Sequence, residues 1–385
     1  MAQQQPPRVP HDSTHLLLQI PDDAQQILLP NPHLSILQFL DFPLPGITVQ
    51  TKHGASAFFS QQDPTTSNLS LLSKILIPNR EVVKALHAVS EDAFANGAKS
   101  IDCLHVVMHP TPRLPLWTIA YWAEVLSLHE TRTPWVLAEE ALHKRRRASM
   151  KKPKTQQLLD DTYLALSMLE WSGYIKGCGN KEPINVLAAY TTRQWLTTAH
   201  ENQILHLLLQ DLAHDPATCK VHVENLQFWN YIQQSYSHRY LDPDAYTESK
   251  HFAYAKGVGE SLSSGARNTL LTVTNVHNNH WVAWELNFED SYIRYGDSSQ
   301  GKAPEEMMKA AEWWTYFHTG RHFAEGLLEI TCQEDGYSCG LFAPNSIAHC
   351  ANPKRFPLLN QADVDDKRLE VMLRVIACHT KRMVS

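Results

Sequence analysis

The segment from His280 to Asp297 constrains the fold of this chain more than any other. Its two halves, HWVAWELN at 280–287 and DSYIRYGD at 290–297, are rich in aromatic and β-branched residues, which is typical of β-strands. Only residues 288 and 289 lie between them, so we expect a tight hairpin. In that register His280 faces Asp297 directly. Opposed Cβ atoms lie roughly 4.5–5.5 Å apart, so the imidazole and the carboxylate could form a hydrogen bond.

The length of this loop decides the register of the whole hairpin. Phe288-Glu289 is not a favoured two-residue turn, and a change of one residue would turn the side chains to the other face of the sheet. We interpret the aromatic residues Trp284 and Tyr295 as core. The predicted register places two further pairs on the face of His280: Val282 with Tyr295, and Trp284 with Ile293.

A second informative segment follows the hairpin. Residues 326–332 (GLLEITC) predict a short strand, residues 333–337 a polar turn, and Ser338 is a suitable N-cap for a helix that opens at Cys339. A thiol in the first helical turn lies near the partial positive charge of the helix N-terminus, which favours the thiolate. The free backbone N–H groups there can hold an oxyanion. Pro344 predicts a kink or an irregular first turn.

Together these segments supply the parts of a thiol nucleophile site. His280 can act as a base, Asp297 can orient its ring, Gln333 can donate an amide N–H, and Cys339 can attack. Each residue also has a structural interpretation on its own. A lone cysteine is usually core, a histidine can end a strand, an aspartate can form a turn, and a glutamine is unremarkable. The combination favours the catalytic interpretation. His277 and His280 have no partners at zinc-site spacing, so we expect no metal.

The order and spacing of these residues resemble those of the ubiquitin-like-protein proteases that process and remove SUMO, and more distantly the adenovirus protease. His280-Trp281 lies 17 residues before Asp297, and Gln333 lies 6 residues before Cys339-Gly340. The papain order, with cysteine first, does not fit. The resemblance implies that His280 is the general base, Asp297 its orienting residue, Gln333 the oxyanion donor and Cys339 the nucleophile.

The resemblance also implies a substrate site. Members of the family clamp a Gly-Gly tail between two tryptophans, and the matching positions are Trp281 and Trp195. Trp195-Leu196, followed by residues 202–205, is similar to a stretched form of the family's Trp-Leu motif that leads into a helix. Ser338 stands where many members have aspartate. The implied activity is cleavage after Gly-Gly of a SUMO-like modifier or its conjugates by a cysteine peptidase or isopeptidase, without a cofactor.

These features predict an α+β protein. The resemblance implies that residues 186–385 form a papain-like or adenain-like cysteine protease domain, with a mixed sheet packed on helices, similar to the divergent fungal or transposon-associated type. A mostly helical accessory region at 16–185 would precede it, after a disordered Gln/Pro-rich terminus at 1–15. Helical spacing of apolar residues occurs in five segments: 80–96, 114–139, 158–169, 304–319 and 363–383.

Composition limits the setting in which the chain works. Its seven cysteines share no CxxC spacing, no secretory segment opens the chain, and no apolar run approaches 18 residues. We therefore expect a reducing compartment, nucleus or cytoplasm, and no membrane partner. The net charge of −6 gives no general reason to expect nucleic acid. The basic run at 144–154 predicts a solvated helix end, a nuclear-import signal or a phosphate contact, in that order.

Two other functions stay open at this point. One is an acyltransferase, because a bacterial effector family that resembles these proteases uses the same residue order for acetylation. The other is a degenerate protease that serves as a nuclear or transposon-associated binding protein. The intact set of four residues at 280, 297, 333 and 339 argues against degeneracy.

Overall fold

The computed structural model describes residues 18–48, 52–242 and 244–384, with side chains up to residue 381. By packing, the chain divides into two compact units. Unit 1 comprises residues 1–136 and 166–172, and unit 2 comprises residues 137–165 and 173–385. The division falls inside helices α6 (Thr118–Ala148) and α7 (Pro153–Met168). The predicted functional boundary at 185/186 stays a prediction, and the predicted disordered segment 1–15 lies outside the described residues.

Unit 1 combines helices with a small sheet that the sequence did not predict. Three short strands pair antiparallel in the order β1-β2-β3. The segment predicted at 80–96 is a helix, α5, and the aromatic segment at 114–139 contains a strand before α6 begins. The bounds in this unit are α2 Asp22–Leu28, α3 Ile36–Asp41, η1 Ala55–Phe58, β1 Phe59–Ser60, α4 Leu69–Leu72, α5 Arg80–Ala95, β2 Ser100–Asp102 and β3 Arg113–Pro115.

Unit 2 contains the residues of the predicted site. Its elements after α7 are η2 Ile184–Thr191, α8 Thr198–Ala213, η3 Pro216–Thr218, β4 Val221–Val223, α9 Phe228–His238, α10 Ala245–Glu248, α11 Ala253–Ser263, β5 Thr269–Val276, β6 His280–Asn287, β7 Tyr292–Gly296, α12 Glu305–Thr319, β8 Ala324–Leu327, α13 Cys339–Ala351, η4 Gln361–Asp363 and α14 Val364–Val384.

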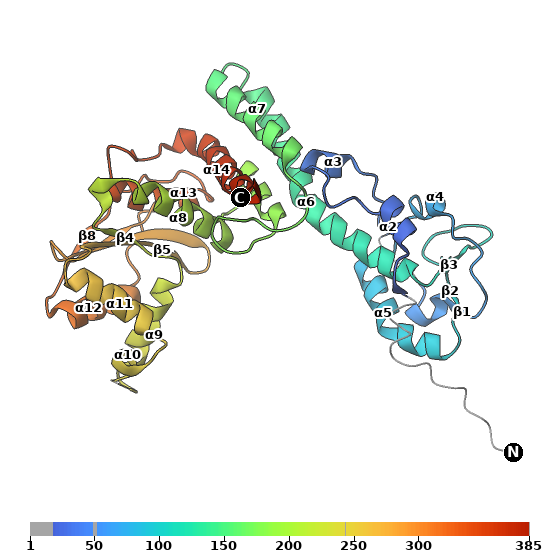
Figure 1. Ribbon diagram of the computed structural model, residues 1–385, viewed down its shortest axis with the longest axis horizontal. Coiled ribbons are helices and arrows are strands. Elements are labelled where there is room, and N and C mark those ends of the chain that lie inside the picture. The colour runs from blue at the N-terminus through green and yellow to red at the C-terminus, as the bar shows by residue number, and fades with distance from the viewer. Residues whose placement is uncertain (1–17, 49–51, 243, 385) are drawn as a thin grey trace. The chain divides into compact units, whose positions relative to one another are not determined.

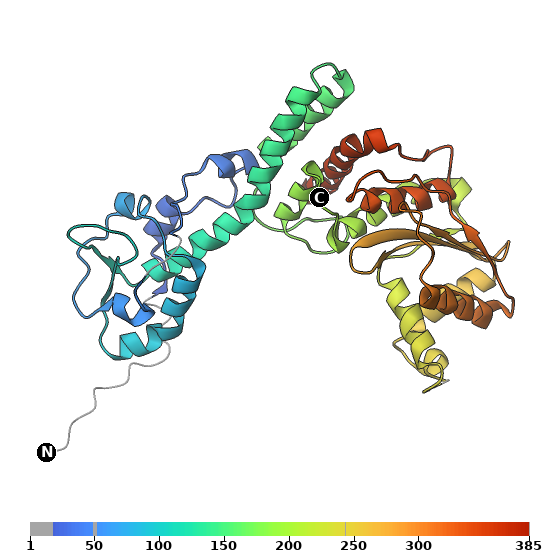
Figure 2. The same ribbon diagram turned by 180° about the vertical axis from the view of Figure 1, so that it is seen from behind.

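The sheet of unit 2 is mixed, as predicted. Its strands lie in the order β4-β5-β6-β7-β8. The central strands β5, β6 and β7 pair antiparallel, while both edge strands pair parallel to their neighbours. Helices cover both faces of this sheet (Figures 1 and 2). The α+β fold class is therefore confirmed.

The register of the β6–β7 hairpin differs from the predicted one. Trp284 pairs with Tyr295, and Ala283 pairs with Gly296, a shift of two residues. The loop holds four residues, 288–291, rather than two, and Ser291 adopts a positive φ of 58° within it. The predicted direct opposition of His280 and Asp297 is therefore wrong. A shift of two residues preserves the face on which each side chain lies, so the predicted face is retained.

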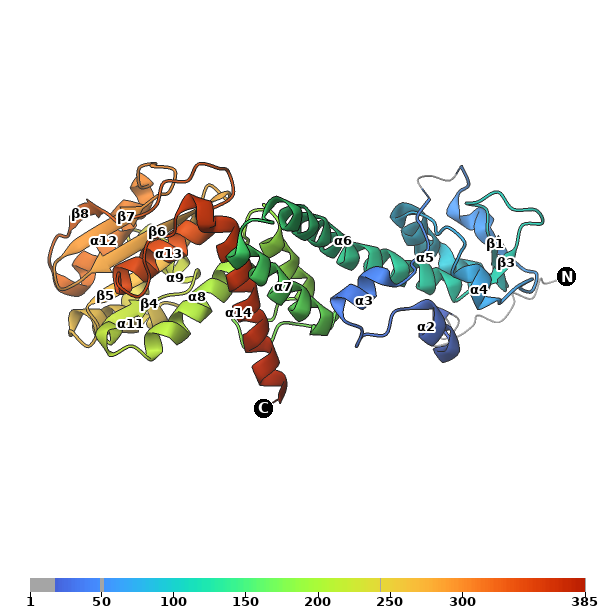
Figure 3. The same ribbon diagram turned by 90° about the horizontal axis from the view of Figure 1, so that it is seen from above.

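Alternation along β6 separates two hydrophobic cores. Val282, Trp284 and Leu286 pack with α9, α11 and α12. Trp281 and Ala283 pack on the other side, with α8 and α13. Figure 3 shows α8 and α13 together over one face of the sheet. The first turn of α13 therefore lies on the face of Trp281, opposite the face to which Trp284 points.

The predicted helices of the second half are present. Pro304 precedes α12, whose first turn holds Glu305 and Glu306 and whose end is closed by Gly320 at φ 66°. The residues predicted to face the sheet, Met307, Met308, Ala311 and Trp314, are all buried in its core. The predicted strand at 326–332 is instead β8, which begins at Ala324 and ends at Leu327. Within the described ranges no helix is long and apolar enough to cross a membrane.

Candidate active site

His280 and Asp297 are in contact despite the changed register. The Nε2–H of His280 donates to Oδ1 of Asp297 at 2.6 Å. Both side chains are largely buried, with 16% of the histidine and 8% of the aspartate side chain exposed. Because Nε2 is engaged by the carboxylate, Nδ1 is the ring nitrogen that can accept a proton. The predicted hydrogen bond is thus confirmed, and its catalytic role stays a prediction.

Asp297 is itself held in place from two further directions. The backbone N–H of Ser299 donates to Oδ1 at 2.7 Å, and the Tyr295 hydroxyl donates to Oδ2 at 3.4 Å. Burial, and then the Asp297 charge, raises the pKa of Tyr295, so this hydroxyl remains a donor. An acceptor with three donors has little freedom to rotate. The arrangement therefore fixes the orientation of the His280 ring.

Cys339 is the first residue of α13, and Asp335 holds the turn that leads into that helix. Ser338, the predicted N-cap, makes no side-chain capping bond. Instead, the backbone N–H groups of Tyr337 and Ser338 both donate to Asp335 Oδ1 at 2.9 Å, and the Ser338 hydroxyl donates to Oδ2 at 2.6 Å. Burial acts to raise the pKa of Asp335, but these hydrogen bonds outweigh it and lower that pKa. An aspartate three residues before a serine was the available sequence signal.

The first turn of α13 contains a shared hydrogen bond. Pro344 lies inside this helix, which runs on to Ala351, and the kink predicted from it stays a prediction. The carbonyl of Ser338 accepts from both Leu341 at 2.9 Å and Phe342 at 3.1 Å, so an i→i+3 bond accompanies the α-helical one. The N–H groups of Cys339 and Gly340 precede the first helical donors and have no such partner. They are the groups that can hold an oxyanion beside the thiol.

Desolvation dominates the environment of the Cys339 side chain. Burial raises the pKa of the Cys339 thiol, while the Trp281 and Gly340 backbone N–H groups lower it by less. The helix N-terminus favours the thiolate, as the sequence predicts, but desolvation at a residue only 3% exposed has the larger effect on this pKa. Among the described residues, no hydrogen bond joins this sulfur to His280. The structure brings His280 to Asp297, and it brings Cys339 to Trp281, the next residue along β6.

Gln333 is positioned by Ser298, the residue after Asp297. The Ser298 hydroxyl donates to Gln333 Oε1 at 2.8 Å, and the Gln333 backbone N–H donates to the Ser298 carbonyl at 2.8 Å. One amide hydrogen on Nε2 is used by the carbonyl of Asp335 at 3.0 Å, which leaves the second available to a ligand. The fully buried Ser298 has no strong sequence signal beyond its place beside Asp297.

The two predicted tryptophans and the thiol line one pocket. Its volume is about 310 Å³. The Trp281 indole N–H donates to the carbonyl of Leu196 at 2.8 Å, and the Trp195 indole N–H donates to the carbonyl of Gly336. Trp281 is buried, whereas half of the Trp195 side chain is exposed. The complete lining is Trp195, Leu196, Thr197, Thr198, Asn275, Asn278, Asn279, Trp281 and Cys339.

An amide-lined groove continues from this pocket. It has a volume of about 470 Å³ and shares Thr198, Asn275, Asn278 and Trp281 with the first pocket. Oδ1 of Asn275 is buried and has no hydrogen-bond partner in the described part of the chain. No side chain that lines the groove carries a charge; the remaining lining residues are Asn180, Asn202, Asn225, Leu226, Gln227, Asn230 and Thr274. Such walls suit the N–H and C=O groups of an extended peptide.

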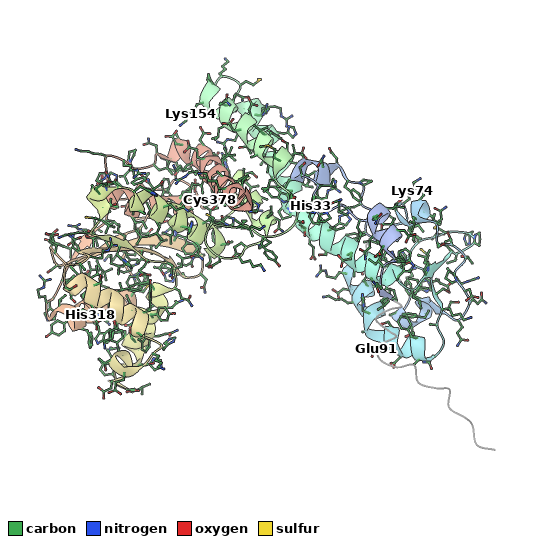
Figure 4. The ribbon with its side chains drawn as sticks, in the orientation of Figure 1. His33, Lys74, Glu91, Lys154, His318 and Cys378 are labelled. Atoms are coloured by element: carbon green, nitrogen blue, oxygen red, sulfur yellow. The ribbon has the colours of Figure 1, made fainter. Side chains whose placement is uncertain are left out.

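Other candidate residues lie away from this site. The aromatic core on α12 includes His318, labelled in Figure 4, which hydrogen-bonds the Tyr246 hydroxyl at 2.8 Å. Part of the basic run is paired: Arg146 contacts Asp160 at 2.7 Å, and Lys154, also labelled, contacts Glu370 at 3.6 Å. Over the described residues, no group of three or more His, Cys, Asp or Glu side chains could hold a metal ion.

Solved structures of SUMO proteases match this chain. The C-terminal Ulp1 protease domain in complex with Smt3, the yeast orthologue of SUMO, is 16% identical, with 57% of this chain and 93% of that chain covered and a TM-score of 0.42. The Chaetomium thermophilum Ulp1-like SUMO protease catalytic domain is 12% identical, over 59% and 89% of the two chains, with a TM-score of 0.37. The Xanthomonas campestris effector protein XopD bound to ubiquitin is 19% identical, over 46% and 90%, with a TM-score of 0.32. No protein-family model and no curated protein matches the chain.

Proposed function

We propose that this protein is a cysteine peptidase or isopeptidase that cleaves after the Gly-Gly terminus of a SUMO-like modifier. One observation carries the proposal: a thiol at the start of a helix lines a tryptophan-walled pocket, and the residue before Trp281 is a histidine held by a buried aspartate. The combination supplies a nucleophile, a base and a place for a narrow peptide. It also explains why the side chains that hold Asp297 and Gln333 are so fully engaged.

The proposed reaction begins with the neutral thiol. His280 is the first residue of β6, so we infer that its ring reaches past the end of the sheet toward the face of α13. Nδ1 of His280 accepts the Cys339 proton as the substrate carbonyl arrives, and Asp297 stabilises the resulting imidazolium. The sulfur attacks the carbonyl carbon of the terminal glycine. Gln333 Nε2–H and the backbone N–H groups at the start of α13 hold the oxyanion. His280 then protonates the leaving amine, and water cleaves the thioester to restore the thiol.

The walls of the pocket support glycine as the residue before the cleaved bond. Two indole rings and a buried thiol leave a volume of about 310 Å³, and Trp281 cannot withdraw because its indole is bonded to Leu196. The neutral groove beyond it suits an extended, uncharged segment before the glycines. The choice of a SUMO-like modifier follows the resemblance in sequence. Smt3 and ubiquitin are the modifiers named with two of the solved structures that match.

A free thiol is part of this proposal. All seven cysteines are unbridged, and a nucleophilic sulfur is preserved only under reducing conditions. We therefore propose that the enzyme works in the nucleus or cytoplasm. Imaging of the full chain with a fluorescent tag tests this, and a signal confined to secretory compartments would refute it.

A cleavage assay tests the proposed reaction. A SUMO precursor with residues after its Gly-Gly should be shortened to the Gly-Gly end by the wild-type protein. Cys339→Ala and Cys339→Ser should abolish turnover while leaving the thermal unfolding temperature close to wild type. Turnover of acetyl-CoA without cleavage would instead identify an acyltransferase. Cleavage that persists in either cysteine variant would refute the nucleophile.

A further inference from the structure

A buried carboxyl lies behind the nucleophile, and the proposed reaction does not use it. Glu201, on α8, is 0% exposed. Neither of its oxygens has a hydrogen-bond partner among the described residues. It lies against Gly340, since a Cβ placed there would be 2.6 Å from Glu201 Oε1. Gly340 follows Cys339 directly, so an acid group is packed beneath the first turn of α13.

The surroundings of Glu201 favour its protonated form. Burial raises the pKa of Glu201 well above its ordinary value, and Arg368 of α14 acts in the opposite direction with less effect. Arg368 donates its hydrogen bonds elsewhere, to the carbonyls of Ala189 at 2.6 Å and Gln194 at 2.7 Å. A helix N-terminus would also favour a carboxylate. However, no N–H group of α13 donates to the Glu201 carboxyl, so desolvation has the larger effect on its pKa.

The other titratable groups around Glu201 oppose a second negative charge. Tyr190 of η2 is fully buried, and its pKa is raised first by burial and then by Glu201. The charge of Glu201 also raises the pKa of the Cys339 thiol on α13. On α8 itself, the ring of His200 is bonded to the Val186 carbonyl and to Thr197, and burial lowers its pKa to about 4, so it is neutral. Only Arg368 among these neighbours offers compensation.

We propose that Glu201 is a positioning residue whose ionisation opposes the loss of the Cys339 proton, so that this carboxyl limits the reactivity of the thiol at alkaline pH. Because coupling between two sites is reciprocal, ionisation of Glu201 opposes thiolate formation and a thiolate makes Glu201 hold its proton more tightly. The relevance of this limit to turnover rests on the proposed function. The coupling itself is a property of the resting protein.

Alkylation of Cys339 as a function of pH tests the proposal without requiring turnover. Iodoacetamide reacts with the thiolate, and peptide mass spectrometry separates Cys339 from the other six cysteines. Glu201→Gln keeps the shape of the side chain and removes its ionisation. The substitution should lower the midpoint of the Cys339 alkylation profile by about one pH unit, because a nearby like charge is removed. Below the midpoint this shift corresponds to roughly tenfold more thiolate.

Glu224→Gln is the matched control. Glu224 is also buried in unit 2, at 1% exposed, but it is bonded to His222 and Tyr254, and it is not among the groups that shift the pKa of Cys339 most. The pH profile of Cys339 alkylation in Glu224→Gln should coincide with that of the wild type. A Glu201→Gln profile that also coincides with the wild type would overturn the proposal. That result would leave the proposed function intact, because precursor cleavage is measured separately.

Two further measurements apply if Glu201→Gln does not fold. Glu201→Leu also removes the charge and should shift the profile in the same direction; an unshifted profile would overturn the proposal. In the wild-type protein, carbon-13 NMR of glutamate carboxyls should show one that is still protonated at neutral pH and titrates together with Cys339 alkylation. A spectrum in which every glutamate is ionised at neutral pH would contradict it.

Discussion

Gly340 shows how closely the residues around the nucleophile are packed. A Cβ at this position would lie 2.6 Å from Glu201 Oε1, 2.9 Å from the Leu196 Cβ and 3.4 Å from Trp281 Cδ1. The Leu196 Cβ is attached to the backbone and cannot move as a side-chain tip can. The absence of a side chain at position 340 is therefore a condition for α13 to approach both α8 and β6.

Gly340→Ala should lower the free energy of unfolding by about 1–3 kcal/mol, the usual effect of overpacking a core, and reduce turnover. Denaturant unfolding measures the first and precursor cleavage the second. Gly257→Ala, in the exposed middle of α11, is the control. No atom lies within 4 Å of its Cβ position, and helix propensity should stabilise it by about 0.5–1 kcal/mol. Equal effects of the two substitutions would show that the packing argument is wrong.

Asp297 should matter for rate more than for substrate binding. Asp297→Ala removes the acceptor that orients His280, so kcat should fall by roughly 10²-fold or more while KM changes little. Steady-state kinetics on a SUMO precursor measures both constants. Asp290→Ala, in the loop of the same hairpin, should leave both unchanged. A normal kcat in Asp297→Ala would mean that the His280 ring needs no orienting residue.

The identities of the site residues and the His280–Asp297 contact were visible in the sequence, whereas their other partners and the shifts of their pKa values were not. His280, Asp297, Gln333 and Cys339 lie in segments whose strand, turn and helix patterns are strong. The turn held by Asp335 and the raised pKa of the Cys339 thiol depend on burial and on hydrogen bonds that only tertiary structure determines. The same holds for Glu201, which at residue level looks like an ordinary glutamate on a helix.

At the scale of elements, the β6–β7 hairpin shows which predictions remain correct when the predicted loop length is wrong. The strands were predicted from their aromatic and β-branched residues, which is a local signal, and β6 has the predicted bounds. The register was predicted from loop length, and a loop of four residues shifted it by two. The His280–Asp297 contact survived because an even shift keeps both side chains on one face.

Helix α8 should make the stability of the protein depend on pH. Burial raises the pKa of Glu201 in the folded state, whereas the unfolded chain titrates near the ordinary value of 4.5. Above pH 4.5 the folded state therefore holds a proton that the unfolded state has lost. The contribution of Glu201 to stability then falls as the pH rises, by about 1.4 kcal/mol per pH unit, until the pKa of the folded state is passed.

Glu201→Gln removes this dependence, so the variant should gain stability relative to the wild type as the pH rises from 5 to 8. Urea unfolding at several pH values measures the difference. Glu224→Gln controls for the loss of a carboxylate elsewhere in unit 2. A difference between Glu201→Gln and wild type that is constant with pH would show that Glu201 has the same pKa in the folded and unfolded states.

At the scale of the whole molecule, the division of the chain was the hardest feature to predict. The compact units divide inside α6 and α7, and each helix continues through the division; Pro134 lies inside α6 close to it. Contact between segments distant in sequence sets such a boundary, and a proline inside a helix does not by itself mark it. Strands β4 and β5 were missed for a related reason: β4 has only three residues, and its parallel pairing with β5 joins distant segments.

The charge of the molecule gives a further prediction at this scale. The net charge is −6, and Arg145, Arg146 and Lys154 of the basic run are paired with acidic side chains. Purified protein should therefore not shift DNA in a gel assay at physiological salt. Binding whose logarithm falls linearly with the logarithm of salt concentration would contradict this and would indicate phosphate contacts by the remaining basic residues.

The most direct test of Cys339 as the nucleophile of a modifier protease is its covalent capture by modifier probes. Purified protein is incubated with a panel of modifiers that end in a Gly-Gly vinyl sulfone, and peptide mapping locates the adduct. We predict one adduct, with the SUMO-based probe, on Cys339, lost in Cys339→Ala and strongly slowed in His280→Ala. An adduct on another cysteine, or no adduct with any modifier while iodoacetamide still labels Cys339, would contradict the assignment of this site as a modifier protease.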